Sequence, residues 1–244
     1  MKPFLILQLR TVDEAADHEF QSILKYSGLT KNEVVRIRME QNGIPELNLQ
    51  DYSGVIVGGG PLMVSDPTDK KTPAEQKFEP QLNDLQKEII EKDFPYFGAC
   101  TGLCTLTKAM GGEVATGRYS ESVEAIEITL NEDGQNDPLL KNLPKSFIAF
   151  SGHKESCQNL PKGATLLASS EKCPIHIIRV KNNVYASQFH PELDVEGIEN
   201  RVNIYKHKGY FPAEDAKKII DDAKKFDIPN PRKILKNFAE KYRS

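Results

Sequence analysis

The 244-residue chain contains no tryptophan, only four cysteines and no apolar run near the ~18 residues that a membrane-spanning helix needs. So few cysteines cannot build a disulfide framework in a chain of this length, and their spacing lacks the paired C-x-x-C knuckles of a zinc site. The N-terminal apolar run is too short for a secretory signal and lacks a small-residue cleavage site. We therefore expect a cytoplasmic protein with no bound metal and no contact with a membrane.

The chain also lacks a large excess of positive or negative charge: the net charge is −3, the isoelectric point is about 6.0 and no polybasic block occurs. This balance argues against nucleic acid as the main partner. The chain is long enough for one α/β domain with a large core, and it has no internal repeat, low-complexity tract or linker. We predict a single domain over residues 1–244.

In the first half of the chain, short apolar runs alternate with segments of helical periodicity. Strands are predicted at 4–9, 33–37, 55–57 and 96–97, and helices at 12–26, 73–92 and 101–110. This order predicts an α/β fold with a doubly wound, mostly parallel sheet and helices on both faces. Functional sites in such sheets lie at the carboxyl ends of the strands.

The second half is richer in strands and turns. Further strands are predicted at 125–130, 147–150, 165–168, 175–180 and 184–188. The turn residues Lys181-Asn-Asn183 predict a hairpin between the last two of these strands. Two helices, at about 212–226 and 231–242, are expected to pack on the core.

The most informative stretch is the segment around Cys100. The apolar pair Tyr96-Phe97 leads into Gly98-Ala-Cys-Thr-Gly102, and a helical pattern follows. Glycines two residues to either side of a nucleophile permit a sharp strand-to-helix turn that exposes its side chain and aims the next backbone N–H at the same space. The helix N-terminus also favours the thiolate over the thiol. Cys100 is therefore a candidate nucleophile.

A candidate base follows the last predicted strand, in Gln188-Phe-His-Pro-Glu192. An imidazole can take the proton of a thiol if a carboxylate on its other nitrogen orients the ring. The rigid proline between His190 and Glu192 restricts where that carboxylate lies. A lone histidine at a strand end is more often structural, but a nucleophilic cysteine in the same sheet favours the catalytic interpretation.

A third element is the glycine turn Gly58-Gly-Gly-Pro61 after the strand at 55–57. Attack on an amide carbonyl creates an oxyanion that needs hydrogen-bond donors. The backbone N–H groups of Gly60 and Thr101 are the candidate pair. A phosphate-binding loop is the weaker interpretation, because neither G-K-[ST] nor G-x-G-x-x-G continues the motif.

Taken together and in this order, Gly-Gly-Pro, Gly-x-Cys-x-Gly and Gln-Phe-His-Pro-Glu resemble the class I glutamine amidotransferase domain, in particular its stand-alone, GMP-synthase-like branch. The resemblance spans residues 4 to about 205 and includes Ser151-Gly-His-Lys-Glu155. It implies a flavodoxin-like core and hydrolysis of the γ-amide of glutamine, or of another γ-glutamyl bond, through a thioester. It also implies that Cys100 is the nucleophile, His190 the acid/base and Glu192 its orienting partner.

The chain departs from the family pattern where the substrate would be recognised. The elbow of the family continues Gly-x-Gln, but Cys104 occupies the position of that glutamine. Val123 stands near a family glycine, and His176 stands where many relatives have glutamine. A redox partner for Cys100 is one interpretation of Cys104, and a small packing residue is the favoured one. The predicted substrate contacts are Gly59, Cys104, Tyr119 and Glu121.

The sequence thus predicts a cysteine-dependent amidohydrolase that needs no cofactor and takes glutamine or a γ-glutamyl compound as substrate. It either supplies ammonia to a synthase subunit in trans or acts alone as a γ-glutamyl hydrolase. The alternative is a non-catalytic binding or regulatory protein that retains the fold. A complete triad favours the enzyme.

Overall fold

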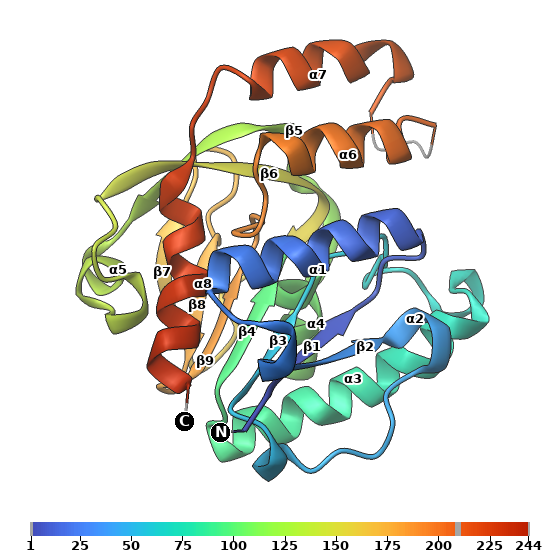
Figure 1. Ribbon diagram of the computed structural model, residues 1–244, viewed down its shortest axis with the longest axis vertical. Coiled ribbons are helices and arrows are strands. Elements are labelled where there is room, and N and C mark those ends of the chain that lie inside the picture. Colours follow the sequence, from blue (N-terminus) through green and yellow to red (C-terminus); the bar gives the residue numbers. More distant parts are fainter. Residues whose placement is uncertain (1, 208–210, 244) are drawn as a thin grey trace.

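The computed structural model describes residues 2–207 and 211–243. Within these residues one sheet runs in the order β2-β1-β3-β4-β9-β8-β7-β5-β6 (Figure 1). Its parallel half consists of β2 (Val34–Arg38), β1 (Phe4–Gln8), β3 (Gly54–Val57), β4 (Tyr96–Ala99) and β9 (Val184–Ser187). Its antiparallel half consists of β8 (Ile177–Val180), β7 (Ala164–Ser169), β5 (Val114–Leu130) and β6 (Ser146–Cys157). The predicted parallel sheet with added antiparallel strands is confirmed.

Helices cover both faces of the parallel half. Alternate residues of β1 point to opposite sides, so Leu5 and Leu7 enter one apolar cluster while Phe4 and Ile6 enter the other. The first cluster includes side chains of α3 (Pro73–Lys92) and α4 (Thr101–Ala109), and the second those of α1 (Asp13–Ser27) and α8 (Pro229–Tyr242). This arrangement is the doubly wound fold expected from the sequence.

Helix α3 illustrates how local signals set element boundaries. Thr72 accepts a hydrogen bond from the backbone N–H of Glu75, whose carboxylate in turn accepts from the backbone N–H of Thr72. Pro73 occupies the first helical position, where a missing N–H costs nothing. The observed helix therefore has the limits predicted for it.

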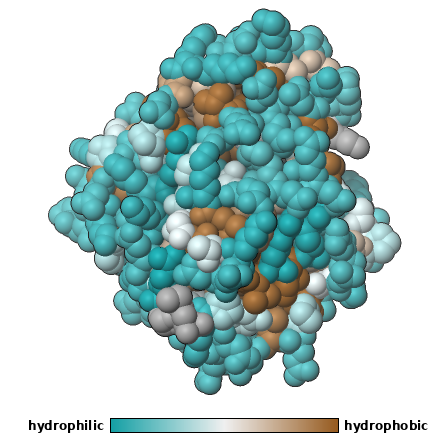
Figure 2. Space-filling model, viewed as in Figure 1, coloured by the Kyte–Doolittle hydropathy of each residue, from teal (hydrophilic) through white to brown (hydrophobic). Residues whose placement is uncertain are grey.

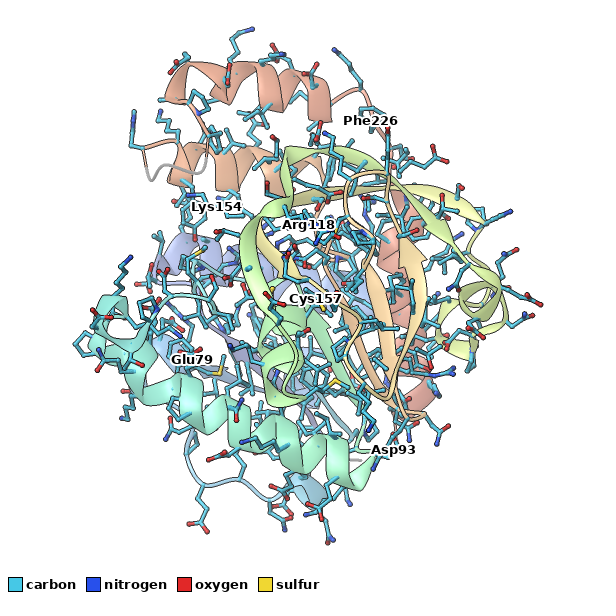
Figure 3. The ribbon with its side chains drawn as sticks, turned by 180° about the vertical axis from the view of Figure 1, so that it is seen from behind. Glu79, Asp93, Arg118, Lys154, Cys157 and Phe226 are labelled. Carbon is cyan, nitrogen blue, oxygen red and sulfur yellow. The ribbon has the colours of Figure 1, made fainter. Side chains whose placement is uncertain are left out.

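The longest strands differ from the prediction. β5 and β6 form one extended ribbon, whereas the sequence predicted only 125–130 and 147–150. The outer part of the ribbon was missed because glycine and serine residues give it a sequence pattern that is typical of a loop. The pairing shifts register on both sides of Glu121, which lies opposite His153. Figure 3 shows this ribbon from behind, with Arg118 on β5 and Cys157 on β6.

A separate layer lies over the ribbon at the end of the molecule drawn uppermost in Figure 1. It is formed by α6 (Val195–Tyr205), which the sequence did not predict, and α7 (Ala216–Ala223). Their apolar side chains pack with Phe150, Leu193 and Val123 in a third, smaller cluster. Figure 2 shows apolar patches at this end within a mostly hydrophilic face. The layer encloses one side of the site described below.

The remaining helical segments are α2 (Met39–Asn42), α5 (Glu132–Asn136) and several short turns of 3-10 helix. None of the helices in the described part of the chain has both the length and the apolar content needed to cross a membrane.

Candidate active site

Cys100 lies at the turn between β4 and α4. Its backbone has φ of 51° and ψ of −99°, a conformation that non-glycine residues rarely adopt and that often marks a functional site. The turn is held by the Cys100 N–H, which donates to the carbonyl of Ser187 at 2.7 Å. A Cβ atom on Gly98 would lie 2.8 Å from the carbonyl oxygen of Gly102. Gly98 is thus required by contact at the turn, and a Cβ on Gly102 would lie 3.2 Å from the carbonyl oxygen of Val57 in β3.

His190 and Glu192 follow β9, the strand next to β4. The Nδ1 atom of His190 lies 2.8 Å from Oε1 of Glu192, and both side chains are buried. Burial alone would lower the pKa of His190, but the Glu192 carboxylate and the neighbouring Cys100 thiol raise it. Gly59 packs directly against this ring, since a Cβ there would lie 2.3 Å from Cε1 of His190. The structure brings the three predicted triad residues and Gly59 together.

A buried charge network behind the triad was not found from the sequence. Arg201 of α6 donates to Oε1 of Glu192 at 2.8 Å, the same oxygen that binds His190. Arg201 also lies 3.5 Å from Glu19 of α1, and Glu19 pairs with Arg10 at 2.7 Å. Burial would raise the pKa of Glu192, but His190 and Arg201 hold it well below its usual range. The orienting carboxylate therefore stays ionised.

One sequence signal could have revealed this network. Asp194 is an N-cap residue that accepts from the N–H of Gly197, and Ile198, Val202 and Tyr205 follow at helical spacing. That pattern predicts a helix directly after the His-Pro-Glu motif. Arg201 lies on it.

The two predicted oxyanion donors lie against each other. The N–H of Gly60 donates to the Thr101 hydroxyl at 3.1 Å, and that hydroxyl donates to the carbonyl of Gly60 at 3.0 Å. Thr101 opens α4, so its own N–H lies at the positive end of the helix. An oxyanion at this place would have to displace the Thr101 hydroxyl from the Gly60 N–H.

A cavity of about 80 Å³ opens beside Cys100. Its polar wall is formed by Arg10, Gly60, Cys100, Ser151, Gly152, His190 and Arg201. Its apolar wall is formed by Val123, Leu193, Ile198, Val202, Tyr205 and Phe211. Val123 packs on Gly152, where an added Cβ would lie 2.9 Å from Cγ2 of Val123. The layer of α6 thus limits the space next to the nucleophile.

Cys104 and Tyr119, two predicted substrate contacts, are not among the residues that line this cavity. Cys104 is buried in the core between α4 and β6, with its thiol 4.0 Å from the carbonyl of Glu155, and burial raises its pKa. Tyr119 lies on the outer part of the ribbon, where the guanidinium of Arg118 is 5.0 Å from its ring centroid. The geometry therefore favours packing as the role of Cys104.

Glu121 is buried within a second polar network. Its carboxylate accepts hydrogen bonds from His153 at 2.9 Å, His176 at 3.2 Å, Ser151 at 2.9 Å and Ser170 at 2.6 Å. Burial would raise the pKa of Glu121, but the two imidazoles hold it far below its usual range. Among these residues, Ser151 lines the cavity. Glu121 thus joins β5 and β6 to the segment between β7 and β8, behind the site, and does not itself line the cavity.

The same region contains a donor set with metal-ligand chemistry. His153, Cys173 and His176 are buried, and one ligand atom from each lies within 4.8 Å of the others. The spacing Cys173-x-x-His176 and the Cys-His₂ composition would suit Zn²⁺. However, both imidazoles already bind the Glu121 carboxylate, so hydrogen bonding accounts for their arrangement and we assign no metal there.

Comparison with known proteins identifies a family. The family model described as glutamine amidotransferase class-I matches residues 15–202. The chain is 28% identical over 192 residues to a subunit of the glutamine-hydrolyzing GMP synthase of Sulfurisphaera tokodaii, covering 78% of this chain and 90% of that protein. It is 28% identical over 163 residues to the corresponding GMP synthase subunit of Archaeoglobus fulgidus, covering 65% and 76%.

Solved structures share the fold over nearly the whole length. A glutamine amidotransferase from Thermotoga maritima superposes with a TM-score of 0.78 at 20% identity, covering 99% of both chains. A glutamine amidotransferase from Methylobacillus flagellatus gives a TM-score of 0.77 at 20% identity, covering 100% of this chain and 94% of that one.

Proposed function

Because the chain belongs to the glutamine amidotransferase class-I family, we propose that it cleaves the γ-amide of glutamine, or of a γ-glutamyl compound, by cysteine catalysis. The observation that carries this proposal is that Cys100 and His190 line one cavity, with Nδ1 of His190 lying 2.8 Å from Oε1 of Glu192. This is the arrangement that nucleophilic catalysis by a thiol requires.

In the proposed reaction, the sulfur of Cys100 attacks the γ-carbonyl carbon while its proton passes to Nε2 of His190. The N–H groups of Gly60 and Thr101 stabilise the oxyanion after it displaces the Thr101 hydroxyl. Collapse of the adduct breaks the C–N bond, and the leaving ammonia or amine takes the proton from His190. The γ-glutamyl thioester is then hydrolysed by a water molecule that gives its proton to His190, releasing glutamate and the thiol.

Trapping with a diazo-ketone analogue of glutamine tests the nucleophile and the acyl group together. We expect one adduct per chain by intact mass on the wild type and none on Cys100→Ala. Hydrolysis of L-glutamine to glutamate should be lost in the same variant. A wild-type protein that neither forms the adduct nor hydrolyses a γ-glutamyl substrate would contradict the proposal and favour a non-catalytic binding protein.

The relatives named as subunits of GMP synthase suggest that the partner is a synthase. We propose that such a partner, supplied in trans, receives the released ammonia. Copurification with a synthase and stimulation of glutamine hydrolysis by it would support this role. Full activity of the isolated chain on γ-glutamyl amides, unchanged by any synthase, would instead indicate an independent γ-glutamyl hydrolase.

A further inference from the structure

Arg10 is a buried cation in the wall of the catalytic cavity that the triad chemistry does not use. It follows β1 at the carboxyl edge of the parallel sheet, where sites in such folds lie. The preceding residue, Leu9, touches the glycine turn, since a Cβ on Gly60 would lie 2.4 Å from Cδ1 of Leu9. Arg10 lines the cavity together with Cys100, and its side chain is only 5% exposed.

The hydrogen bonding of this guanidinium is incomplete. Its Nε donates to Oε1 of Glu19 at 2.7 Å. No group among the described residues accepts a hydrogen bond from its two terminal nitrogens, and these atoms are not enclosed within protein. A planar guanidinium edge with free N–H groups is complementary to a carboxylate, which it can bind through two parallel hydrogen bonds.

The neighbouring charges hold Arg10 in place. Glu19 is fixed by Gln8, whose side-chain N–H donates to Oε2 at 2.8 Å, and it lies 3.5 Å from Arg201. Arg201 itself donates a hydrogen bond to Glu192. Burial alone would lower the pKa of Arg10, but Glu19 raises it, so the side chain remains a cation inside the cavity. Arg10 therefore has binding capacity that its protein neighbours do not use.

We propose that Arg10 binds the α-carboxylate of the γ-glutamyl substrate and so fixes the acyl group against Cys100. The proposal rests on the function proposed above. A γ-glutamyl group carries its α-carboxylate three carbons from the carbonyl that the thiol attacks, and the cavity holds both Arg10 and Cys100. Cys104, at the position of the family's substrate-holding glutamine, is packed in the core, so recognition of the substrate has to be provided elsewhere.

The test compares L-glutamine with L-glutaminamide, in which a neutral amide replaces the α-carboxylate. In the wild type we expect kcat/KM to favour L-glutamine by about 10- to 100-fold, the range for a charge-assisted pair of hydrogen bonds in a shielded site. In Arg10→Met the preference should fall below about threefold. The control is Arg179→Met, which removes a partly buried, salt-bridged arginine of β8 that does not line the cavity. It should retain the wild-type preference.

Two further measurements separate recognition from damage to the fold. Alkylation of Cys100 by neutral iodoacetamide should proceed within about threefold of the wild-type rate in Arg10→Met if the elbow is intact. If that variant does not fold, Arg10→Lys keeps the charge but not the bidentate edge, and it should raise KM for L-glutamine while kcat changes little. In that case an unchanged KM would overturn the proposal.

An equal preference for L-glutamine in the wild type and in Arg10→Met would also overturn the role of Arg10. Hydrolysis of L-glutamine and trapping of Cys100 would then still support the proposed function. Failure of the wild type to hydrolyse or to be trapped would instead count against the function itself. The two failures are thus distinguishable.

Discussion

Two buried carboxylates in this protein, Glu192 and Glu121, accept hydrogen bonds from histidine side chains. The two sites differ in what the rest of each histidine ring contacts. Glu192 accepts from His190 and Arg201, and the ring of His190 lies beside the Cys100 thiol at the cavity. Glu121 accepts from two imidazoles and two hydroxyls. The other nitrogen of His153 lies 3.1 Å from the carbonyl of Glu155, and the ring of His176 stacks on Phe189.

The two networks differ in what the imidazole ring faces, and this difference is the basis for assigning catalysis to the first pair alone. The hydrogen-bond distances of the two pairs are similar, at 2.8 Å for Glu192 with His190 and 2.9 Å for Glu121 with His153. The first pair has Cys100 beside it, at the cavity. The cysteine near the second pair, Cys173, does not line the cavity, and burial raises the pKa of its thiol to about 12. The second joins β5 and β6 to the segment between β7 and β8, and its carboxylate does not line the cavity of Cys100, so we expect it to contribute stability.

The largest difference should follow from removing one histidine of each network. His190→Gln removes the base, and we expect kcat/KM for a γ-glutamyl substrate to fall by about 10³- to 10⁴-fold. His153→Gln should leave kcat/KM within about fivefold while lowering the midpoint of thermal unfolding, because it breaks a buried hydrogen-bond network. Comparable losses of activity in the two variants would remove the distinction between the networks.

A smaller loss is expected when the orienting carboxylate alone is neutralised. Glu192→Gln keeps the shape of the side chain and a hydrogen bond to His190 but removes the charge that stabilises the imidazolium. We expect kcat to fall by about 10²-fold, less than in His190→Gln. Steady-state assays of both variants on the same substrate give this order. A loss as large as that of His190→Gln would mean that Glu192 does more than orient the ring.

Arg201 forms an ion pair with Glu192, whereas no arginine or lysine in the described part of the chain is paired with Glu121. Arg201 lowers the pKa of His190, so Arg201→Gln should make the Cys100–His190 pair easier to protonate. The acid limb of the pH profile of kcat/KM should therefore move to higher pH, by about half a unit to one unit, with activity recovering at alkaline pH. Arg179→Met should show the wild-type profile. A limb that stays in place would exclude an electrostatic role for Arg201.

Glu121 should affect stability in acid. Its pKa in the folded protein is far below the ordinary value of 4.5, so its contribution to the free energy of unfolding is complete above that pH and is lost as the pH falls below it. Glu121→Gln should lower stability at pH 7 and make the decline between about pH 4.5 and pH 2 shallower. Denaturant titrations across this range measure the slope. An unchanged slope would mean that the Glu121 network does not favour the ionised form.

The smallest effect is expected at Cys104. Because its thiol packs toward the carbonyl of Glu155 and does not line the cavity, Cys104→Ala should change kcat/KM by less than about threefold. The cost should be about 1 kcal/mol of stability for one small buried group. Activity assays before and after mild oxidation check both roles. Protection from oxidative inactivation in Cys104→Ala would instead support a redox partnership with Cys100.

The sequence was sufficient for the features that local signals specify. Helix α3 carries its own capping box and apolar face, and the elbow at Cys100 is encoded by neighbouring glycines. The motifs of the proposed triad could be brought together from the sequence because they follow the ends of β4 and β9, which are neighbouring strands of the sheet. The network of Arg10, Glu19 and Arg201 was not predictable, because these residues lie on separate elements and each resembles a surface charge when the chain is read locally. Their burial is a property of the assembled fold.

One contact in the core also bears on how the chain folds during synthesis. The ring of Phe238 in α8 lies 6.1 Å from that of Phe4 in β1 and 6.0 Å from that of Phe97 in β4. Since the ribosome makes β1 before α8, one face of the central strands is covered only by α1 until α8 has been translated. Until then, the nascent protein would leave part of that apolar face exposed.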